Sequence, residues 1–190
     1  KLIDLNREGG IGCSCTLLQI GEFNILIDSG LHPKLSGRAA LPEFAKLTSI
    51  SIDLYILTHC HLDHLGSLPV AMRHSPAAPC LMSLSSRMIV ERMMHNSANV
   101  MRRQAAEGQT KDEPHFTHED VDQIAPRLTG LAFNHPKRFT KGNDEVEITL
   151  HPAGHVAGAA AVEIRHKHRH IFVTGDVLFE YMTNREFPDT

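Results

Sequence analysis

The segment HCHLDH, residues 59–64, constrains this chain more than any other feature of its sequence. Three histidines and one aspartate directly follow the apolar run DLYIL, which has the length of a buried strand and no helical period. A hydrophobic core does not accept such a group without partners, because burying polar or charged side chains costs free energy. The segment therefore predicts a strand that ends in a metal-binding loop.

The spacing of these donors favours a shared ion. His59 and His61 are two residues apart, and in extended backbone such side chains project to the same side. Asp63 continues the alternation, whereas His64 either turns elsewhere or belongs to a following helical turn. Neutral imidazole and carboxylate are the ligands that zinc and related divalent ions prefer at catalytic sites.

Two further donors lie far along the chain, each at the end of a predicted strand. His155 stands in HPAGHVAGAA, where Gly154 and Gly158 permit a tight backbone. Asp176 ends the strand-like run in FVTGDVLF. Ligands that come from strand ends can converge at one rim of a sheet, so we expect both residues beside the HCHLDH loop.

Six donors are too many for one zinc ion and suit two ions if a carboxylate bridges them. We assign Asp176 as the bridge, with a water or hydroxide shared by both ions. The predicted ligands of the first ion are His59, His61, His155 and Asp176, and those of the second are Asp63, His64 and Asp176. The second ion is then one protein ligand short, and we place the missing ligand beyond Thr190.

Most of the 14 histidines lack the spacing and the strand-end position expected of metal ligands. The run HKHRH, residues 166–170, is interpreted as the solvated tip of a hairpin, and His151 as a strand residue. Isolated histidines are interpreted as ordinary surface or core residues: His32, His74, His95, His115, His118 and His135.

Composition sets limits on the remaining possibilities. The 190 residues suffice for one domain, and no apolar run approaches the length that spans a bilayer. Four cysteines without a C-x-x-C pair predict reduced thiols and an intracellular protein, with Cys13 and Cys15 as buried thiols rather than a soft-metal site. The formal net charge of −3 gives no general attraction for nucleic acid, so bound cations would have to attract a phosphate.

The remaining patterns predict strands, then helices, then strands. Gly21 and Glu22 are expected to form the turn of a hairpin, and Thr117 with Asp120 resembles a capping box. The longest predicted helix starts from Ser85 or Ser86 as N-cap. The predicted helices span residues 66–74, 85–106 and 118–126, and the predicted strands lie within 15–28, 53–59, 79–83, 145–151, 159–166 and 170–176. This order indicates an α/β layered sandwich with helices outside.

These residues resemble a known family. H-C-H-L-D-H resembles the H-x-H-x-D-H signature of the metallo-β-lactamase superfamily, and Asp28 in ILIDSGLHP resembles its first motif. His155 and Asp176 match its third and fourth metal motifs. Four segments are similar to motifs of the β-CASP branch of RNA-processing nucleases: IDSGLHP, THCHLDHLGSLP, PAGHVAGAA and VTGD. The resemblance runs from about Cys13 to Asp176.

The resemblance implies a four-layer αββα sandwich and two Zn²⁺ ions, with Mn²⁺ or Fe²⁺ as alternatives. It implies hydrolysis of phosphodiester bonds in single-stranded RNA by a hydroxide that bridges the metals. Asp63 and Asp176 are then the catalytic carboxylates among the metal ligands, and Asp28 orients a ligand histidine by a hydrogen bond. The expected location is the cytoplasm, or the nucleus in a eukaryote, with no membrane association.

The same resemblance bears on domain organisation. The sequence starts at Lys1 rather than Met, and we expect residues 1–190 to be a metallo-β-lactamase-like domain cut from a longer protein. In the β-CASP branch a further domain follows the T-G-D strand, and later histidines supply the last zinc ligand and a general acid. We therefore expect no leaving-group acid within these residues.

Two other functions remain open at this point. The first is a hydrolase of the same fold that acts on a thioester, lactone or lactam. The long predicted helix and the segments similar to β-CASP motifs favour the nuclease over this alternative. The second is a non-catalytic scaffold subunit of an RNA-processing complex, against which the six retained donors argue.

Overall fold

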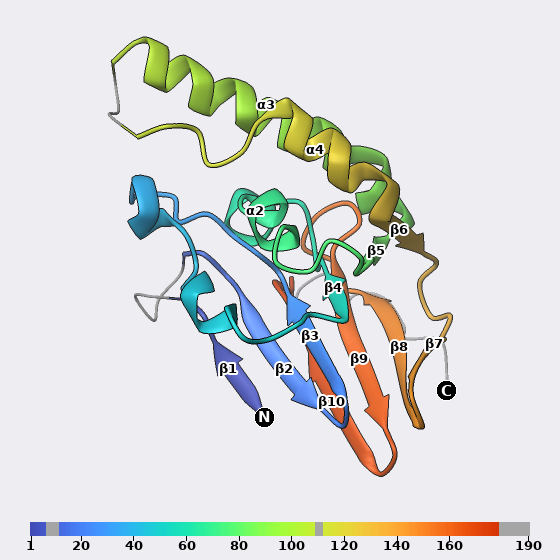
Figure 1. Cartoon of the computed structure of the whole chain (residues 1–190). Coiled ribbons are helices and arrows are strands. Elements are labelled where there is room, and N and C mark those ends of the chain that lie inside the picture. Colours follow the sequence, from blue (N-terminus) through green and yellow to red (C-terminus); the bar gives the residue numbers. More distant parts are fainter. Residues whose placement is uncertain (7–11, 109–111, 179–190) are drawn as a thin grey trace.

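Two β-sheets packed face to face form the centre of the protein, and helices cover the outer face of the first sheet (Figure 1). The computed structural model describes residues 1–6, 12–108 and 112–178. The described residues thus supply layers of helix, sheet and sheet, in agreement with the predicted α/β sandwich.

The first sheet has the strand order β1-β2-β3-β4-β5-β6. β1, β2 and β3 are antiparallel, whereas β3, β4, β5 and β6 run parallel to one another. Parallel strands point their carboxyl ends to the same edge, so the residues that follow β3 and β4 meet there. The strands are β1 Leu2–Asp4, β2 Thr16–Ile20, β3 Phe23–Ile27, β4 Leu54–Ile56, β5 Cys80–Ser83 and β6 Leu128–Leu131.

The second sheet is an antiparallel meander with the order β10-β9-β8-β7. Within it, the end of β8 pairs with the start of β9, and the start of β9 pairs with the end of β10. Its strands are β7 Lys137–Lys141, β8 Asp144–Pro152, β9 Ala160–His166 and β10 Arg169–Val173. The β8–β9 loop and the residues after β10 therefore emerge at one edge.

The helices lie on the side of the first sheet that faces away from the second. The longest of them, α3, has Ser83 as its N-cap, and α4 begins with a capping box formed by Thr117 and Asp120. The α-helices are α1 Leu62–Leu65, α2 Leu68–Met72, α3 Leu84–Ala106 and α4 His118–Ile124, and the 3₁₀ turns are η1 Gly37–Ala40, η2 Phe44–Leu47 and η3 Ala125–Arg127.

The central strands β3, β4 and β5 of the first sheet are buried on both faces, which explains their nearly continuous apolar sequences. In β3, Ile25 and Ile27 face the second sheet, whereas Leu26 between them faces the helices. In β4, Tyr55 likewise points toward the helices, and its hydroxyl donates a hydrogen bond to the carbonyl of Ala71 in α2. Each fully buried side chain of this size stabilises the fold by about 1.5–3 kcal/mol relative to an exposed one.

The hairpin with its turn at Gly21 and Glu22, the long helix, the α4 capping box and the β9–β10 hairpin are confirmed. The prediction that Ser85 or Ser86 caps the long helix is wrong. Ser83 is the cap, because β5 ends there with extended backbone and its side chain accepts a hydrogen bond from the backbone N–H of Ser86.

Three strands were not predicted, because their own residues give a weak strand pattern. β1 has only three residues, β6 is the short LTGL with a central glycine, and β7 is the charged edge strand KRFTK. None of these runs has enough alternation to stand out by itself.

Two predictions about individual residues are corrected or refined. His166 is not part of a solvated tip: it is buried and its Nε2 lies 2.8 Å from Oδ1 of Asp144, whereas residues 167–170 are exposed. Cys13 and Cys15 are buried thiols as expected, and both precede β2.

Candidate metal centre

The edge where both sheets present their strand ends carries a cluster of polar side chains. Asp28 follows β3, and Thr58 and His59 come two and three residues after the end of β4. From the second sheet, His155 lies in the β8–β9 loop and Asp176 follows β10. The backbone N–H of Ala160, at the start of β9, donates to the carbonyl of Thr58 at 2.9 Å, which joins the two sheets at this edge.

The HCHLDH segment changes from strand to helix within six residues. His59 is fully buried, and His61 is the extended residue that precedes α1. Asp63 and His64 lie in the single turn of α1, so of the two placements left open for His64 the helical turn is correct. The backbone N–H of His64 donates to the carbonyl of His61, which fixes the turn.

The four histidines and Asp176 lie close enough to share ions. The Nδ1 atom of His61 is 3.2 Å from Nε2 of His155, and the rings of His59 and His61 are 4.7 Å apart between centroids. The two oxygens of Asp176 diverge: one is 3.4 Å from Nε2 of His64 and the other 3.6 Å from Nε2 of His155.

Two groups of donors result, with His59 common to both. One contains His59, His61 and His155, and the other contains His59, His64 and Asp176, each with its ligand atoms within 4.8 Å of one another. Asp63 lies at the margin, with its carboxylate 3.9 Å from Nε2 of His64. The structure thus brings the six predicted donors to one edge and leaves Asp63 outside both groups.

The environment of His59 fits a cation. Among the described residues, its Nε2 is the buried side-chain nitrogen or oxygen that has no hydrogen-bond partner. Burial, together with the imidazoles of His64 and His61, lowers the pKa of His59 to about 3, so the ring is neutral. A buried acceptor without a donor costs about 1–3 kcal/mol, and a metal ion at Nε2 removes that cost.

Thr58 sets the orientation of these rings. Its hydroxyl donates to the carboxylate of Asp28 at 2.8 Å and lies 3.2 Å from Nδ1 of His59. Since the hydroxyl hydrogen is used toward Asp28, we assign the His59 proton to Nδ1, which leaves the lone pair of Nε2 directed into the cluster. Sequence reasoning missed Thr58, and its position directly before the first histidine was the available signal.

Asp28 contacts His64 directly. Its Oδ2 is 2.7 Å from Nδ1 of His64, and its Oδ1 accepts the backbone N–H of Thr58 at 2.8 Å. Burial by itself would lower the pKa of His64, but the hydrogen bond and the negative charge of Asp28 outweigh it and raise the pKa. The Nδ1 proton therefore points to Asp28, and Nε2 faces Asp176.

Imidazole nitrogens with free lone pairs and a two-oxygen carboxylate are the donors that Zn²⁺ takes, and Mn²⁺ and Fe²⁺ accept the same set. The residues present therefore fit a divalent metal ion. The histidines interpreted as ordinary do not join either group within the described residues. His151, for example, contacts Asn134 and Glu163 instead.

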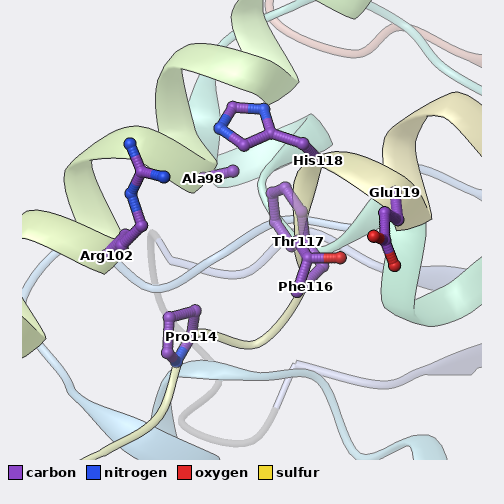
Figure 2. Close-up of a pocket in the computed structure, with 7 residues that line it drawn as sticks. All are labelled: Ala98, Arg102, Pro114, Phe116, Thr117, His118 and Glu119. Atoms are coloured by element: carbon purple, nitrogen blue, oxygen red, sulfur yellow. The ribbon is translucent and has the colours of Figure 1, made fainter.

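A separate pocket of about 290 Å³ lies between the carboxyl-terminal half of α3 and residues 114–119 (Figure 2). Arg102, Phe116 and His118 are among the seven side chains that line it. None of the six candidate metal donors belongs to this lining. The pocket and the metal cluster are therefore distinct features.

Within the parts of the chain that the structure describes, no helix combines the length and the apolar character needed to cross a membrane.

Comparison with known proteins gives consistent results. The family model described as metallo-beta-lactamase superfamily matches residues 9–188. The chain is 31% identical over 183 residues to "Endoribonuclease ysh-1" of Neurospora crassa, covering 93% of this chain and 20% of that protein. It is 30% identical over 167 residues to "Cleavage and polyadenylation specificity factor 73" of Drosophila melanogaster, covering 87% and 23%.

The chain thus spans about a fifth of the length of these relatives. A solved structure from Enterococcus faecalis V583, described as a protein of unknown function, matches with a TM-score of 0.54 and 21% identity over 88% of this chain and 41% of its own. That likeness supports the fold. The family model and the named relatives confirm the resemblance that the motifs predicted.

Proposed function

Because the chain belongs to the metallo-beta-lactamase superfamily, we propose that it provides the metal centre of a hydrolase that cleaves phosphodiester bonds in single-stranded RNA. The observation that carries the proposal is the convergence of six donors from both sheets at one edge. The relatives named as endoribonucleases support RNA as the substrate.

We assign the first cation to His59, His61, His155 and Asp176. Asp63, His64 and Asp176 hold the second, with Asp176 between the two ions. The two diverging contacts of the Asp176 carboxylate, to His64 and to His155, support this bridging role. Zn²⁺ is the preferred metal for this donor set, and Mn²⁺ or Fe²⁺ are alternatives.

Two bound cations would supply activation of a water molecule and neutralisation of the charge on a reacting phosphate. The protein's own part is positioning. Thr58 holds the ring of His59, and Asp28 holds the ring of His64. The carboxylates of Asp63 and Asp176, which lie 3.9 and 3.4 Å from Nε2 of His64, are the catalytic candidates. Since the net charge of the chain is −3, the ions rather than the surface give the attraction for phosphate.

The domain organisation is part of the same proposal. Residues 1–190 form a metallo-β-lactamase-like domain, and a β-CASP domain with later histidines completes the second metal site and supplies a general acid. The share of 20–23% that the chain covers in its relatives supports this. The four cysteines, Cys13, Cys15, Cys60 and Cys80, form no disulfide, and this supports a reducing intracellular location, the cytoplasm or the nucleus of a eukaryote.

The test uses the purified full-length protein with labelled single-stranded RNA, and with a thioester and a lactone as competing substrate classes. Asp176→Asn should lower RNA cleavage by about 10²–10³-fold, since it removes the charge placed between the ions. Metal content, measured by mass spectrometry of the intact protein, should fall with it. Asp122→Asn is the control, because that carboxylate is exposed on α4 outside the cluster.

Equal RNA cleavage by metal-free protein would contradict the proposal. Turnover of the thioester or lactone with intact RNA would instead assign the same fold to a small-molecule hydrolase. Bound metal without turnover of any of these substrates would favour a scaffold subunit.

A further inference from the structure

Two buried serines at the start of α3 hold the loop that carries His155. Ser83 and Ser86 have no exposed surface. The hydroxyl of Ser83 donates to the carbonyl oxygen of Gly158 at 2.7 Å, and the hydroxyl of Ser86 donates to the same oxygen at 3.1 Å. One carbonyl oxygen has two lone pairs, so both bonds form together.

The loop itself leaves little freedom at this point. Gly158 has a φ of +83°, and a Cβ built there would lie 2.7 Å from the backbone nitrogen of Ser86 and 2.9 Å from the hydroxyl of Ser83. The loop is closed at its base by the bond from the Ala153 N–H to the Ala159 carbonyl at 3.0 Å. The backbone of the loop therefore rests directly on the amino-terminal turn of α3.

The position of His155 matters because its Nε2 is 3.2 Å from His61 and 3.6 Å from Asp176. Metal–ligand distances tolerate deviations of only about 0.2 Å, so a loop that carries a ligand must be fixed to nearly that precision. The carbonyl of Gly158, three residues from His155, is the point where the loop is tied to the first sheet's helical layer.

We propose that Ser83 and Ser86 are positioning residues for His155: their two hydroxyls fix the β8–β9 loop and thereby set the affinity of the first metal site. This inference rests on the proposed function, which makes His155 a metal ligand. Neither serine touches the metal, and both act through the backbone of the loop.

Helix capping does not account for this pair. A cap needs one acceptor, and the Ser83 hydroxyl oxygen fills that role by accepting the backbone N–H of Ser86 at 3.1 Å. The Ser86 hydroxyl contributes nothing to that bond, yet it is completely buried and directed at Gly158. Ser86→Ala therefore removes the loop contact, together with the 3.1 Å contact between the two serine hydroxyls, and keeps the backbone N–H that bonds to the Ser83 cap.

The experiment titrates Zn²⁺ alone into metal-free full-length protein with a competing chelator, and records the thermal midpoint of the metal-free form. Ser86→Ala should weaken zinc binding about 10-fold and the double variant Ser83→Ala/Ser86→Ala about 100-fold, the range seen for residues that orient metal ligands. Thr117→Ala is the matched control, because it removes the hydroxyl cap of α4 away from the loop. It should lower the thermal midpoint and leave zinc affinity unchanged.

Wild-type zinc affinity in both Ser86→Ala and the double variant would overturn the inference, as would an equal loss of affinity in Thr117→Ala. The readout needs no RNA. Zinc binding that depends on the serines without any RNA cleavage by the wild type would refute the proposed substrate and leave the positioning role standing. Failure of the wild type to bind zinc would overturn both proposals.

Discussion

At the scale of single residues, the centre depends on which ring nitrogen each histidine turns inward. His59 and His64 both direct Nδ1 away from the cluster, the first toward Thr58 and the second toward Asp28. Their pKa values move in opposite directions. Burial and the neighbouring imidazoles lower the pKa of His59, whereas the hydrogen bond and charge of Asp28 outweigh burial and raise the pKa of His64. Asp28 thus acts on both rings, once directly and once through the hydroxyl of Thr58.

We expect Asp28→Asn to weaken zinc binding by about 10–100-fold, because the amide loses the charge and one of the acceptor positions that hold His64 and Thr58. Zinc titration against a chelator is the measurement. Asp53→Asn is the control: this carboxylate stands before β4, at the opposite end of the strand, and accepts hydrogen bonds from Asn24 and Lys141. An equal loss of affinity in both variants would show that the effect is one of general stability.

At the scale of elements, the β2–β3 hairpin shows how one turn serves both sheets. Gly21 has a φ of +55°, in the left-handed region, and its neighbour Glu22 donates its backbone N–H to Asp144 of β8 at 2.8 Å. A Cβ at Gly21 would overlap the side chains of Asp144 and His166. Glycine is therefore required twice, for the backbone conformation and for the contact with the second sheet.

Gly21→Ala should destabilise the protein more than Gly108→Ala does. Gly108 has a similar φ of +67° after α3, with no atom within 4 Å of a built Cβ, so its substitution costs only the left-handed conformation, about 1–2 kcal/mol. At Gly21 the overlap adds about 1–3 kcal/mol. Urea unfolding of both variants measures the difference in their free energies of unfolding. An equal decrease in both variants would contradict the close contact of Gly21 with Asp144 and His166.

At the scale of the whole molecule, the two sheets are tied at both edges. One tie is the metal cluster with the Ala160–Thr58 bond. The other joins the β2–β3 turn to the second sheet: Asp144 accepts from Glu22 and contacts His166 at 2.8 Å, and Lys141 donates to the carbonyl of Glu22 at 2.7 Å. The second tie depends on a carboxylate, so it is sensitive to acid.

The hydrogen bond from the Glu22 backbone, followed by the bond to His166, holds the pKa of Asp144 well below its usual range. A carboxyl whose pKa is lower in the folded state stabilises the protein above its unfolded pKa of about 4, and this stability is lost as the pH falls below that value. We therefore expect the thermal midpoint of the wild type to decrease below about pH 4.

Asp144→Asn should reduce the midpoint at pH 7 and flatten its decrease in acid, as measured by thermal unfolding between pH 3 and pH 7. Glu145→Gln, at the neighbouring exposed carboxylate of the same strand, should keep the decrease of the wild type. The same acid decrease in Asp144→Asn would show that other carboxylates govern the acid response.

Local patterns determined a large part of this protein. The apolar runs of β2, β3 and β9, the alternation of β8, the capping box of α4 and the donors of HCHLDH can all be recognised from neighbouring residues, because strand periods and cap chemistry act within a few positions. His155 and Asp176 could be proposed as donors for the same reason, since each follows a strand and lies beside glycine.

Only the tertiary structure decided how these parts act together. It buried His166 against Asp144 and placed Asp63 at the margin of the cluster. It also brought Thr58 into contact with the ring of His59, and the two serines at the start of α3 into contact with the loop that carries His155. These contacts join residues up to 75 positions apart, and their geometry follows from how two sheets pack against each other. Packing of that kind is set by the fit of whole layers, which no short run of residues contains.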